Sequence, residues 1–189
     1  MGGGRRRKAR GEGDVWKGLA AGLAGGLVAS WTMNRFQDVW SKLAEEFGQA
    51  EEQSSARDGS GENQQAQGGG EQTDATVKAA SAISEGIFDH KLTKGEKKIA
   101  GPAVHYAFGT TAGGLYGAVA ELAPEVTAGA GLPFGAAFWL VADEMAVPLL
   151  GLSKRPTEYP FSTHVYALAS HLVYGLTAEA VRRAARNAL

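Results

Sequence analysis

The chain of 189 residues has no cysteine, and its 19 basic and 20 acidic residues leave a formal net charge of −1. The lack of cysteine excludes disulfides, thiolate metal sites and a cysteine nucleophile. The balanced charge argues against a general nucleic-acid binder, and the sequence has no zinc or RNA-binding motif. We therefore expect no nucleic-acid partner, and the length fits one domain.

The mean hydropathy of −0.18 is low, because a polar middle dilutes apolar blocks on both sides. The most informative block is residues 131–151, GLPFGAAFWLVADEMAVPLLG. Apolar residues surround Asp143 and Glu144 on every side of a helix drawn through it, as in a deep core helix or a membrane span. Its 21 residues reach about 31 Å, which is the thickness of a bilayer core. We interpret it as a transmembrane helix with an acidic site.

Three further apolar blocks occupy residues 18–33, 102–120 and 162–181. Together the blocks predict an all-α, polytopic membrane protein with about four transmembrane helices, plus amphipathic surface helices over residues 36–47 and 76–100. A cleaved signal peptide is the alternative for residues 18–33, which follow a basic head. Because that block continues directly into an amphipathic helix, we favour an uncleaved span.

The chain therefore divides into four parts. Residues 1–17 are a basic cytoplasmic N-terminus, and residues 18–48 hold the first span and an amphipathic helix. Residues 49–75 are rich in Gln, Glu, Ser and Gly, which predicts a disordered linker. Residues 76–189 form an amphipathic helix and a three-span bundle. Basic clusters at both chain ends predict cytoplasmic termini, although Lys154, Arg155 and the lysines before residue 102 oppose this orientation.

Small residues recur every four positions in two of the blocks. Such stripes let helix backbones approach closely in membranes. We predict helix packing through Gly22 and Gly26, within the stripe Gly18, Gly22, Gly26 and Ser30, and through Gly109, Gly113 and Gly117.

The C-terminal half contains AGPAVHYAFGTTAGGLYG, LPFGAAFWLVADEMAVPLLGL and STHVYALASHLVYG. In these segments it resembles the YagU-like bacterial inner-membrane family, well over residues 90–182 and weakly over residues 15–48. The resemblance implies a multi-pass protein of the bacterial inner (cytoplasmic) membrane with a link to acid tolerance. It implies no reaction.

Polar residues of three blocks fall at one predicted depth. Counted from the outer ends of their helices, Glu144, His171 and Thr110 lie about 12–13 Å deep. Pro148 lacks an N–H, so it kinks the helix and frees the carbonyl of Glu144. With the adjacent Asp143, these residues are a candidate proton or ion site, since ionisable groups within membranes are functional candidates. His105 and His164 form a shallower, secondary polar pair.

We expect Glu144, supported by His171, to bind and release a proton, so that acid weakens their attraction. The alternative is that these residues only hold the helices together. Other classes are a scaffold or accessory subunit of a membrane complex, which would use the glycine stripes, and a metal-binding membrane enzyme. The partners expected are the lipid bilayer and either a second copy or another membrane protein.

A metal site would use Glu144 and the histidines at 105, 164 and 171, and a bis-histidine haem between His105 and His164 is geometrically conceivable. The sequence has neither a His-x-x-x-His nor a Glu-x-x-His motif, and no nucleophile-elbow motif supports Ser-His-Asp hydrolysis. We therefore assign no catalytic residue, metal ligand or cofactor.

Overall fold

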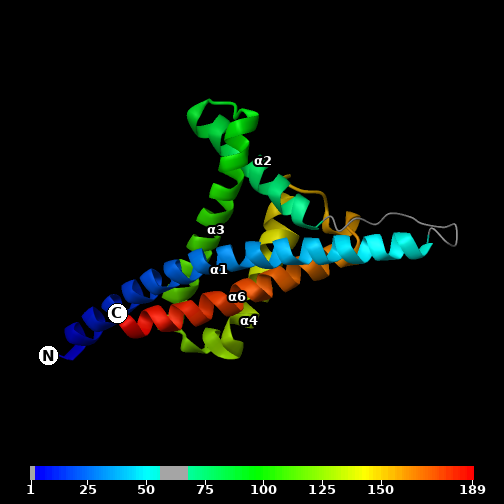
Figure 1. The fold of residues 1–189 in the computed structure, drawn as a ribbon. Helices are drawn as coiled ribbons and strands as arrows, with labels where there is room; N and C mark the ends of the chain where they lie inside the picture. Colours follow the sequence, from blue (N-terminus) through cyan, green and yellow to red (C-terminus); the bar gives the residue numbers. More distant parts are fainter. Residues whose placement is uncertain (1–2, 56–67) are drawn as a thin grey trace.

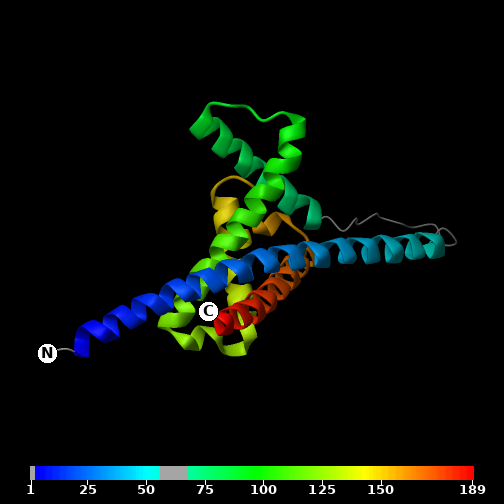
Figure 2. The same ribbon diagram turned by 60° about the vertical axis from the view of Figure 1, so that its left-hand side comes forward.

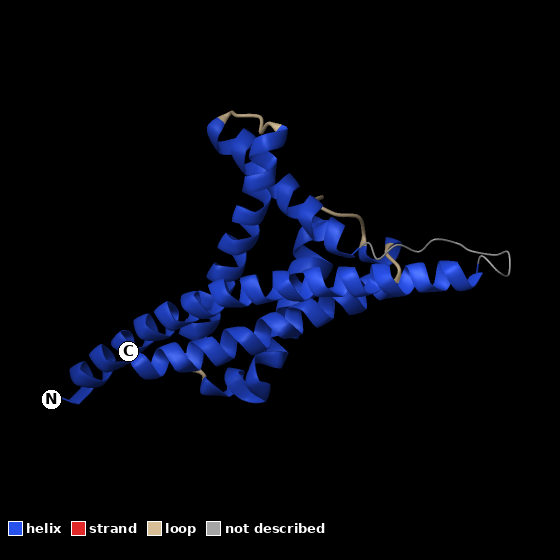
Figure 3. Ribbon diagram, in the orientation of Figure 1, coloured by secondary structure: helices blue, strands red, loops and turns tan. Residues whose placement is uncertain are grey.

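The computed structural model describes the backbone of residues 3–55 and 68–189, and the side chains of residues 14–46 and 74–189. Within these ranges all regular structure is helical, as predicted (Figure 3). The long helices are α1 (Gly3–Ser55), α2 (Gly68–Phe88), α3 (Lys94–Leu122) and α6 (Phe161–Ala188). Between α3 and α6 the chain forms η1 (Pro124–Gly131), α4 (Leu132–Trp139), η2 (Leu140–Ala146), α5 (Val147–Leu149) and η3 (Pro156–Glu158).

The helices form two crossing antiparallel pairs (Figure 1). α1 and α6 run side by side in opposite directions, and α3 crosses α1. After α3, η1 turns the chain so that α4, η2 and α5 return in the opposite direction to α3. The α2–α3 hairpin projects from this bundle in both views (Figures 1 and 2).

The structure does not establish four membrane spans. Within the described residues, only Pro124–Leu149 is long and apolar enough to cross a membrane, with a mean hydropathy of 1.3 over its most apolar window. Positive φ angles at Gly129, Ala130 and Gly131 interrupt this range, so its regular helix covers residues 132–149, about 27 Å long. The other three predicted spans carry Gly, Ser, Thr, Tyr or His among their apolar residues or have charged residues close by, which lowers their mean hydropathy.

The described part of the first third of the chain is helical. α1 is one continuous helix, so the first span and the amphipathic helix are not separate elements. Helix also covers residues 49–55 and 68–75, the two ends of the predicted linker; residues 56–67 lie outside the described residues. Ala, Glu and Gln have high helix propensities, which favours helix at both ends of the predicted linker.

The amphipathic helix predicted over residues 76–100 is two helices. α2 ends at Phe88, and Asp89 adopts a positive φ of 49°. α3 begins with a capping box, in which Thr93 N–H donates to Glu96 Oε2 at 2.7 Å and Glu96 N–H donates to Thr93 Oγ1 at 3.3 Å. The Thr93 backbone hydrogen bond lowers the pKa of the Glu96 carboxyl. The reciprocal bonds fix the start of the helix.

Small and polar residues fill the interior of the bundle. Among the described side chains, the buried apolar ones are Ala, Tyr and Met, and none is Leu, Ile, Val, Phe or Trp. Ala29, Met33, Tyr174 and Ala178 form the buried cluster. Large aliphatic side chains lie outside, with Leu115 61% and Val141 58% exposed. This distribution is the reverse of a water-soluble core, in which large aliphatic residues are the most buried.

The two glycine stripes lie against each other where α1 crosses α3. A Cβ atom added at Gly22 would meet Gly113 O at 2.3 Å, and one added at Gly26 would meet Gly109 O at 2.5 Å. One added at Gly117 would collide with the backbone of Gly18. The two backbones are therefore in direct contact, with no room for side chains between them.

Candidate functional site

The two central acids lie on a π-helical turn. η2, residues Leu140–Ala146, carries Asp143 and Glu144 and widens the helix just before Pro148. The N–H of Val147 donates to the carbonyl of Ala142, five residues back. A kink was predicted at Pro148. The helical turn just before it is a π-turn, which contains one residue more than an α-helical turn. π-Turns inside α-helices are frequent at functional sites.

Glu144 pairs with His164 of α6. Glu144 Oε1 lies 2.7 Å from His164 Nδ1, and His164 Nε2 lies 3.0 Å from the carbonyl oxygen of Pro156. Both side chains are mostly buried, with 16% and 23% exposed. The imidazole therefore connects the π-turn to the loop that precedes α6.

Both ring nitrogens of His164 face oxygen atoms, and a neutral imidazole has only one N–H. A neutral imidazole beside a carboxylate therefore satisfies one of the two contacts. One added proton, on the ring or on the carboxyl group of Glu144, would satisfy both.

Asp143 lies beside His171. The separation from Asp143 Oδ2 to His171 Nδ1 is 3.6 Å, and Nδ1 is 2.9 Å from the carbonyl oxygen of Ala167. His171 is 3% exposed. The predicted Glu144–His171 pair is thus replaced by two pairs, because the π-turn directs the adjacent acids to histidines seven residues apart on α6. His105 is not paired with His164 by any hydrogen bond in the described residues.

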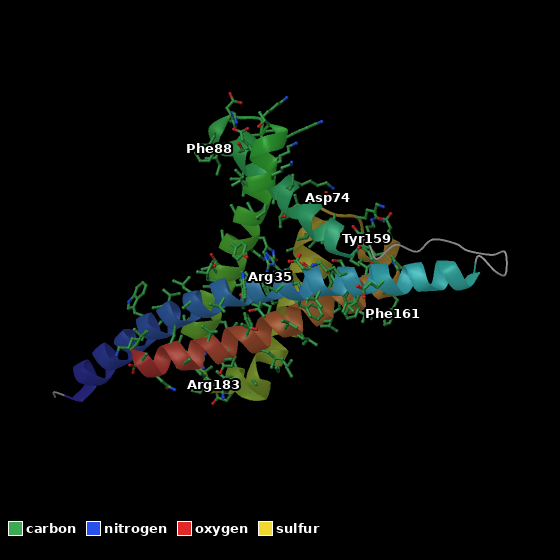
Figure 4. The ribbon with its side chains drawn as sticks, in the orientation of Figure 1. Arg35, Asp74, Phe88, Tyr159, Phe161 and Arg183 are labelled. Atoms are coloured by element: carbon green, nitrogen blue, oxygen red, sulfur yellow. The ribbon has the colours of Figure 1, made fainter. Side chains whose placement is uncertain are left out.

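A single cavity of about 360 Å³ collects most of the predicted site. The predicted residues that line it are His105, Asp143, Glu144, His164 and His171. Thr110 is not among the lining residues; its Cα faces Gly26 at the contact of α3 with α1. Tyr159, which sequence reasoning did not select, lines the cavity ahead of α6, at the opposite end of that helix from Arg183 (Figure 4).

The arrangement does not favour a metal centre. In the part of the chain that the structure describes, no group of three or more His, Asp and Glu side chains is placed to hold a metal ion. His105, His164, His171 and Glu144, the residues of the metal-enzyme alternative, line one cavity without forming such a group.

A second ionic cluster was missed in the sequence. Glu179 of α6 is 1% exposed, and its carboxylate accepts hydrogen bonds from Tyr116 Oη at 2.9 Å and from Arg182 Nε and Nη2 at 2.7 and 2.9 Å. Arg183 Nε also donates to it. The sequence signal was available, since acids and arginines three and four residues apart on a helix are neighbours, but the arginines were interpreted only as a basic end to the last span.

Further ion pairs and a hydrogen bond connect the beginning of α1 to the end of α6 and to α3. Arg186 Nε is 2.7 Å from Glu121 Oε1, and Arg186 Nη2 is 3.3 Å from Asp14 Oδ1. The hydrogen bonds that Arg186 donates to the Glu121 carboxylate raise the pKa of its guanidinium. Lys17 Nζ donates to the backbone oxygen of Leu189 at 2.7 Å. The start of the described side chains and the C-terminus therefore lie at the same end of the bundle.

Comparison with known proteins adds a family but no activity. The family described as "Protein of unknown function (DUF1440)" matches residues 84–180, which are 97 of the 189 residues. No curated protein and no solved structure matches the chain significantly. The matched range includes α3, the π-turn with both acids, and α6 as far as the Glu179 cluster. The match covers just over half of the chain, so the protein belongs to the DUF1440 family, and the matched range holds both acids of the π-turn, the three histidines of the cavity and Glu179.

Proposed function

We propose that the protein is an integral membrane protein of the bacterial inner membrane that responds to protons through Glu144–His164 and Asp143–His171. The observation that carries the proposal is that the acids of both pairs lie on a π-turn. That turn belongs to the one helix in the described chain with the length and hydropathy of a span. Ionisable groups in such a segment are costly and are typical of proton or ion sites.

The packing supports a lipid environment. Without a hydrophobic force between helices, membrane bundles associate through small residues and polar contacts, and the interior of this bundle is made of them. The exposed apolar side chains come from all four segments that we propose to span the membrane, α1, α3, α4 to α5 and α6. They include Leu27, Trp31, Phe108, Leu115, Leu140, Val141 and Val165.

The position of the chain ends supports cytoplasmic termini. Asp14, Lys17, Arg186 and Leu189 are connected at one end of the bundle. Arg182, Arg183 and the basic N-terminal residues belong to the same end of their helices. Basic residues beside spans favour the cytoplasmic side, so we place this end there.

Membrane integration predicts resistance to extraction. Expressed in bacteria, the protein should stay in the membrane pellet after washes with alkaline carbonate and with high salt, because its apolar helices contact lipid directly. Immunoblotting of the fractions, with a peripheral and an integral marker protein, measures this. Release into the carbonate supernatant with the peripheral marker would contradict the proposal.

Protons act on the Glu144–His164 pair in both directions. Without the added proton, one of the two contacts of His164 joins two acceptors: a ring nitrogen without a hydrogen faces either the Pro156 oxygen or a carboxylate oxygen of Glu144. With a second added proton, an imidazolium faces a neutral carboxyl group. Either change weakens the link between the π-turn and α6. The other ionisable groups that line the cavity are Asp143, His171, His105 and Tyr159.

Glu144→Gln should remove the pH response without unfolding the protein. The amide N–H can donate to His164 Nδ1 while Nε2–H donates to Pro156, so a neutral imidazole satisfies both contacts and the carboxyl group that would take up the proton is gone. We expect proton flux in reconstituted vesicles, and survival of expressing cells in acid, to lose their dependence on this protein. His171→Gln should have a smaller effect, since Asp143 is 3.6 Å away.

Glu125→Gln is the matched control, because Glu125 is exposed on η1, away from the cavity. Wild-type behaviour of Glu144→Gln across the pH range would mean that the pairs only pack the helices. Failure of Glu144→Gln to accumulate, with normal accumulation of Glu125→Gln, would instead favour the scaffold alternative. The exposed Val39, Trp40 and Leu43 on α1 are the surface that such a scaffold would offer to a partner.

A further inference from the structure

The cavity beside the π-turn has the size and walls of a ligand site. Its volume of about 360 Å³ lies at the small end of the range of about 300–1,000 Å³ for small-molecule pockets. α1, α2, α3, η2 and α6 all contribute to its walls, which are mainly apolar. A ligand that fills it must therefore have an apolar body.

The cavity has two acidic side chains, Asp143 and Glu144, and no lysine or arginine in its described lining. Each acid has a histidine beside it, but these are the only basic groups in the described lining. The site is therefore suited to a cation and unsuited to an anion.

Aromatic rings surround the space. Phe108, Phe138 and Tyr174 come from α3, α4 and α6, and Tyr159 precedes α6. The faces of such rings attract a cation, more strongly when water is excluded. His105 Nε2, from the α3 wall, is buried and has no hydrogen-bond partner among the described residues. This nitrogen is therefore available to form a hydrogen bond with a ligand in the cavity.

We propose that the cavity binds an organic ammonium ion, with its apolar body among the aromatic rings and its nitrogen between Asp143 and Glu144. The site deepens the proposed function, because it uses the same carboxylates. The ammonium supplies a positive charge beside the two carboxyl groups. A primary ammonium is the preferred form, since its three N–H groups match the carboxylate and imidazole acceptors.

The test uses the full-length protein purified in detergent micelles, with 4-phenylbutylamine as the probe and 4-phenylbutan-1-ol as its uncharged counterpart. Titration calorimetry should show saturable binding of the amine, with the alcohol at least about tenfold weaker because it lacks charge-assisted hydrogen bonds. Glu144→Gln and Asp143→Asn should each weaken amine binding by about tenfold. Glu125→Gln, outside the cavity, should bind like the wild type.

A second variant blocks the space without changing charge. Ala79→Phe adds a ring to the α2 wall of the cavity, and it should abolish binding of the amine while circular dichroism and gel filtration remain as in the wild type. Equal affinity for amine and alcohol, or undiminished amine binding by Ala79→Phe and by both charge variants, would overturn the proposal.

The two proposals fail separately. Amine binding by a wild-type protein without pH-dependent proton flux would support the cation site and contradict the proton response. A pH response without amine binding, in the same preparation, would contradict the cation site and leave the proton response in place.

Discussion

Replacement of Glu179 by leucine is expected to destabilise the bundle by about 3–5 kcal/mol, because it leaves a buried guanidinium without its carboxylate. Arg182 is 8% exposed, and both its Nε and its Nη2 donate to Glu179. Tyr116 Oη loses its acceptor at the same time. The substitution thus affects α3 and α6 together, at the point where they are joined by a side-chain hydrogen bond.

Thermal unfolding in detergent micelles, followed by circular dichroism, measures the loss. Glu125→Leu is the matched control, since it is the same chemical change on an exposed residue, and it should leave the midpoint nearly unchanged. Glu179→Gln should lie between, because the amide keeps one acceptor oxygen for Arg182 but loses the charge and the second acceptor. An unfolding midpoint for Glu179→Leu equal to that of the control would mean that the cluster contributes nothing to stability.

A double variant distinguishes the net contribution of the Glu179–Arg182 pair to stability from the destabilisation caused by removing only one partner. Well-packed apolar residues in place of a buried ion pair are often neutral or stabilising. Glu179→Leu with Arg182→Leu should therefore recover part of the stability that the single change loses. Arg183, which is half exposed, remains in the double variant and can turn its guanidinium toward the surface.

Helical class and the spacing of small residues were visible in the sequence, because both depend on local periodicity. Gly22, Gly26, Gly109, Gly113 and Gly117 repeat at four residues, and a repeat of four stays on one face of any α-helix. The number of spans was less accessible. Glycine fits a close helix contact but has a low hydropathy, so the residues that suggest membrane packing also lower the mean hydropathy of the helices that carry them.

The pairing of the acids was not accessible from position along the chain. Counting residues from the helix ends places Glu144 and His171 at the same depth. It does not say on which side of its helix each side chain lies. An extra residue in a turn rotates the following positions by about 100° relative to an α-helix, and the π-turn at Leu140–Ala146 has no sequence signature of its own. Thr110 shows the same limit, since at a suitable depth it faces α1 rather than the acids.

Gly113→Ala is expected to disrupt the contact between α1 and α3, although it adds a single methyl group. The new Cβ would lie 2.5 Å from the Cα of Gly26 and 2.7 Å from the carbonyl oxygen of Gly22. Those atoms are backbone and cannot rotate away, so the helices must separate. We expect a loss near the upper end of the range of about 1–3 kcal/mol for overpacked interiors, or failure to accumulate.

Gly114→Ala is the control for this change, on the neighbouring residue of the same helix. Its Cβ meets the side-chain atoms of Leu23, with Cδ2 at 2.7 Å, and a leucine can change rotamer at small cost. Gly86→Ala, with open space around it, should stabilise α2 by about 0.5–1 kcal/mol, since alanine favours helix over glycine. Unfolding midpoints in one detergent compare the three. If Gly113→Ala unfolds at the temperature of Gly114→Ala, the backbone contact between the stripes does not hold α1 against α3, and the basis for packing these helices through glycine is lost.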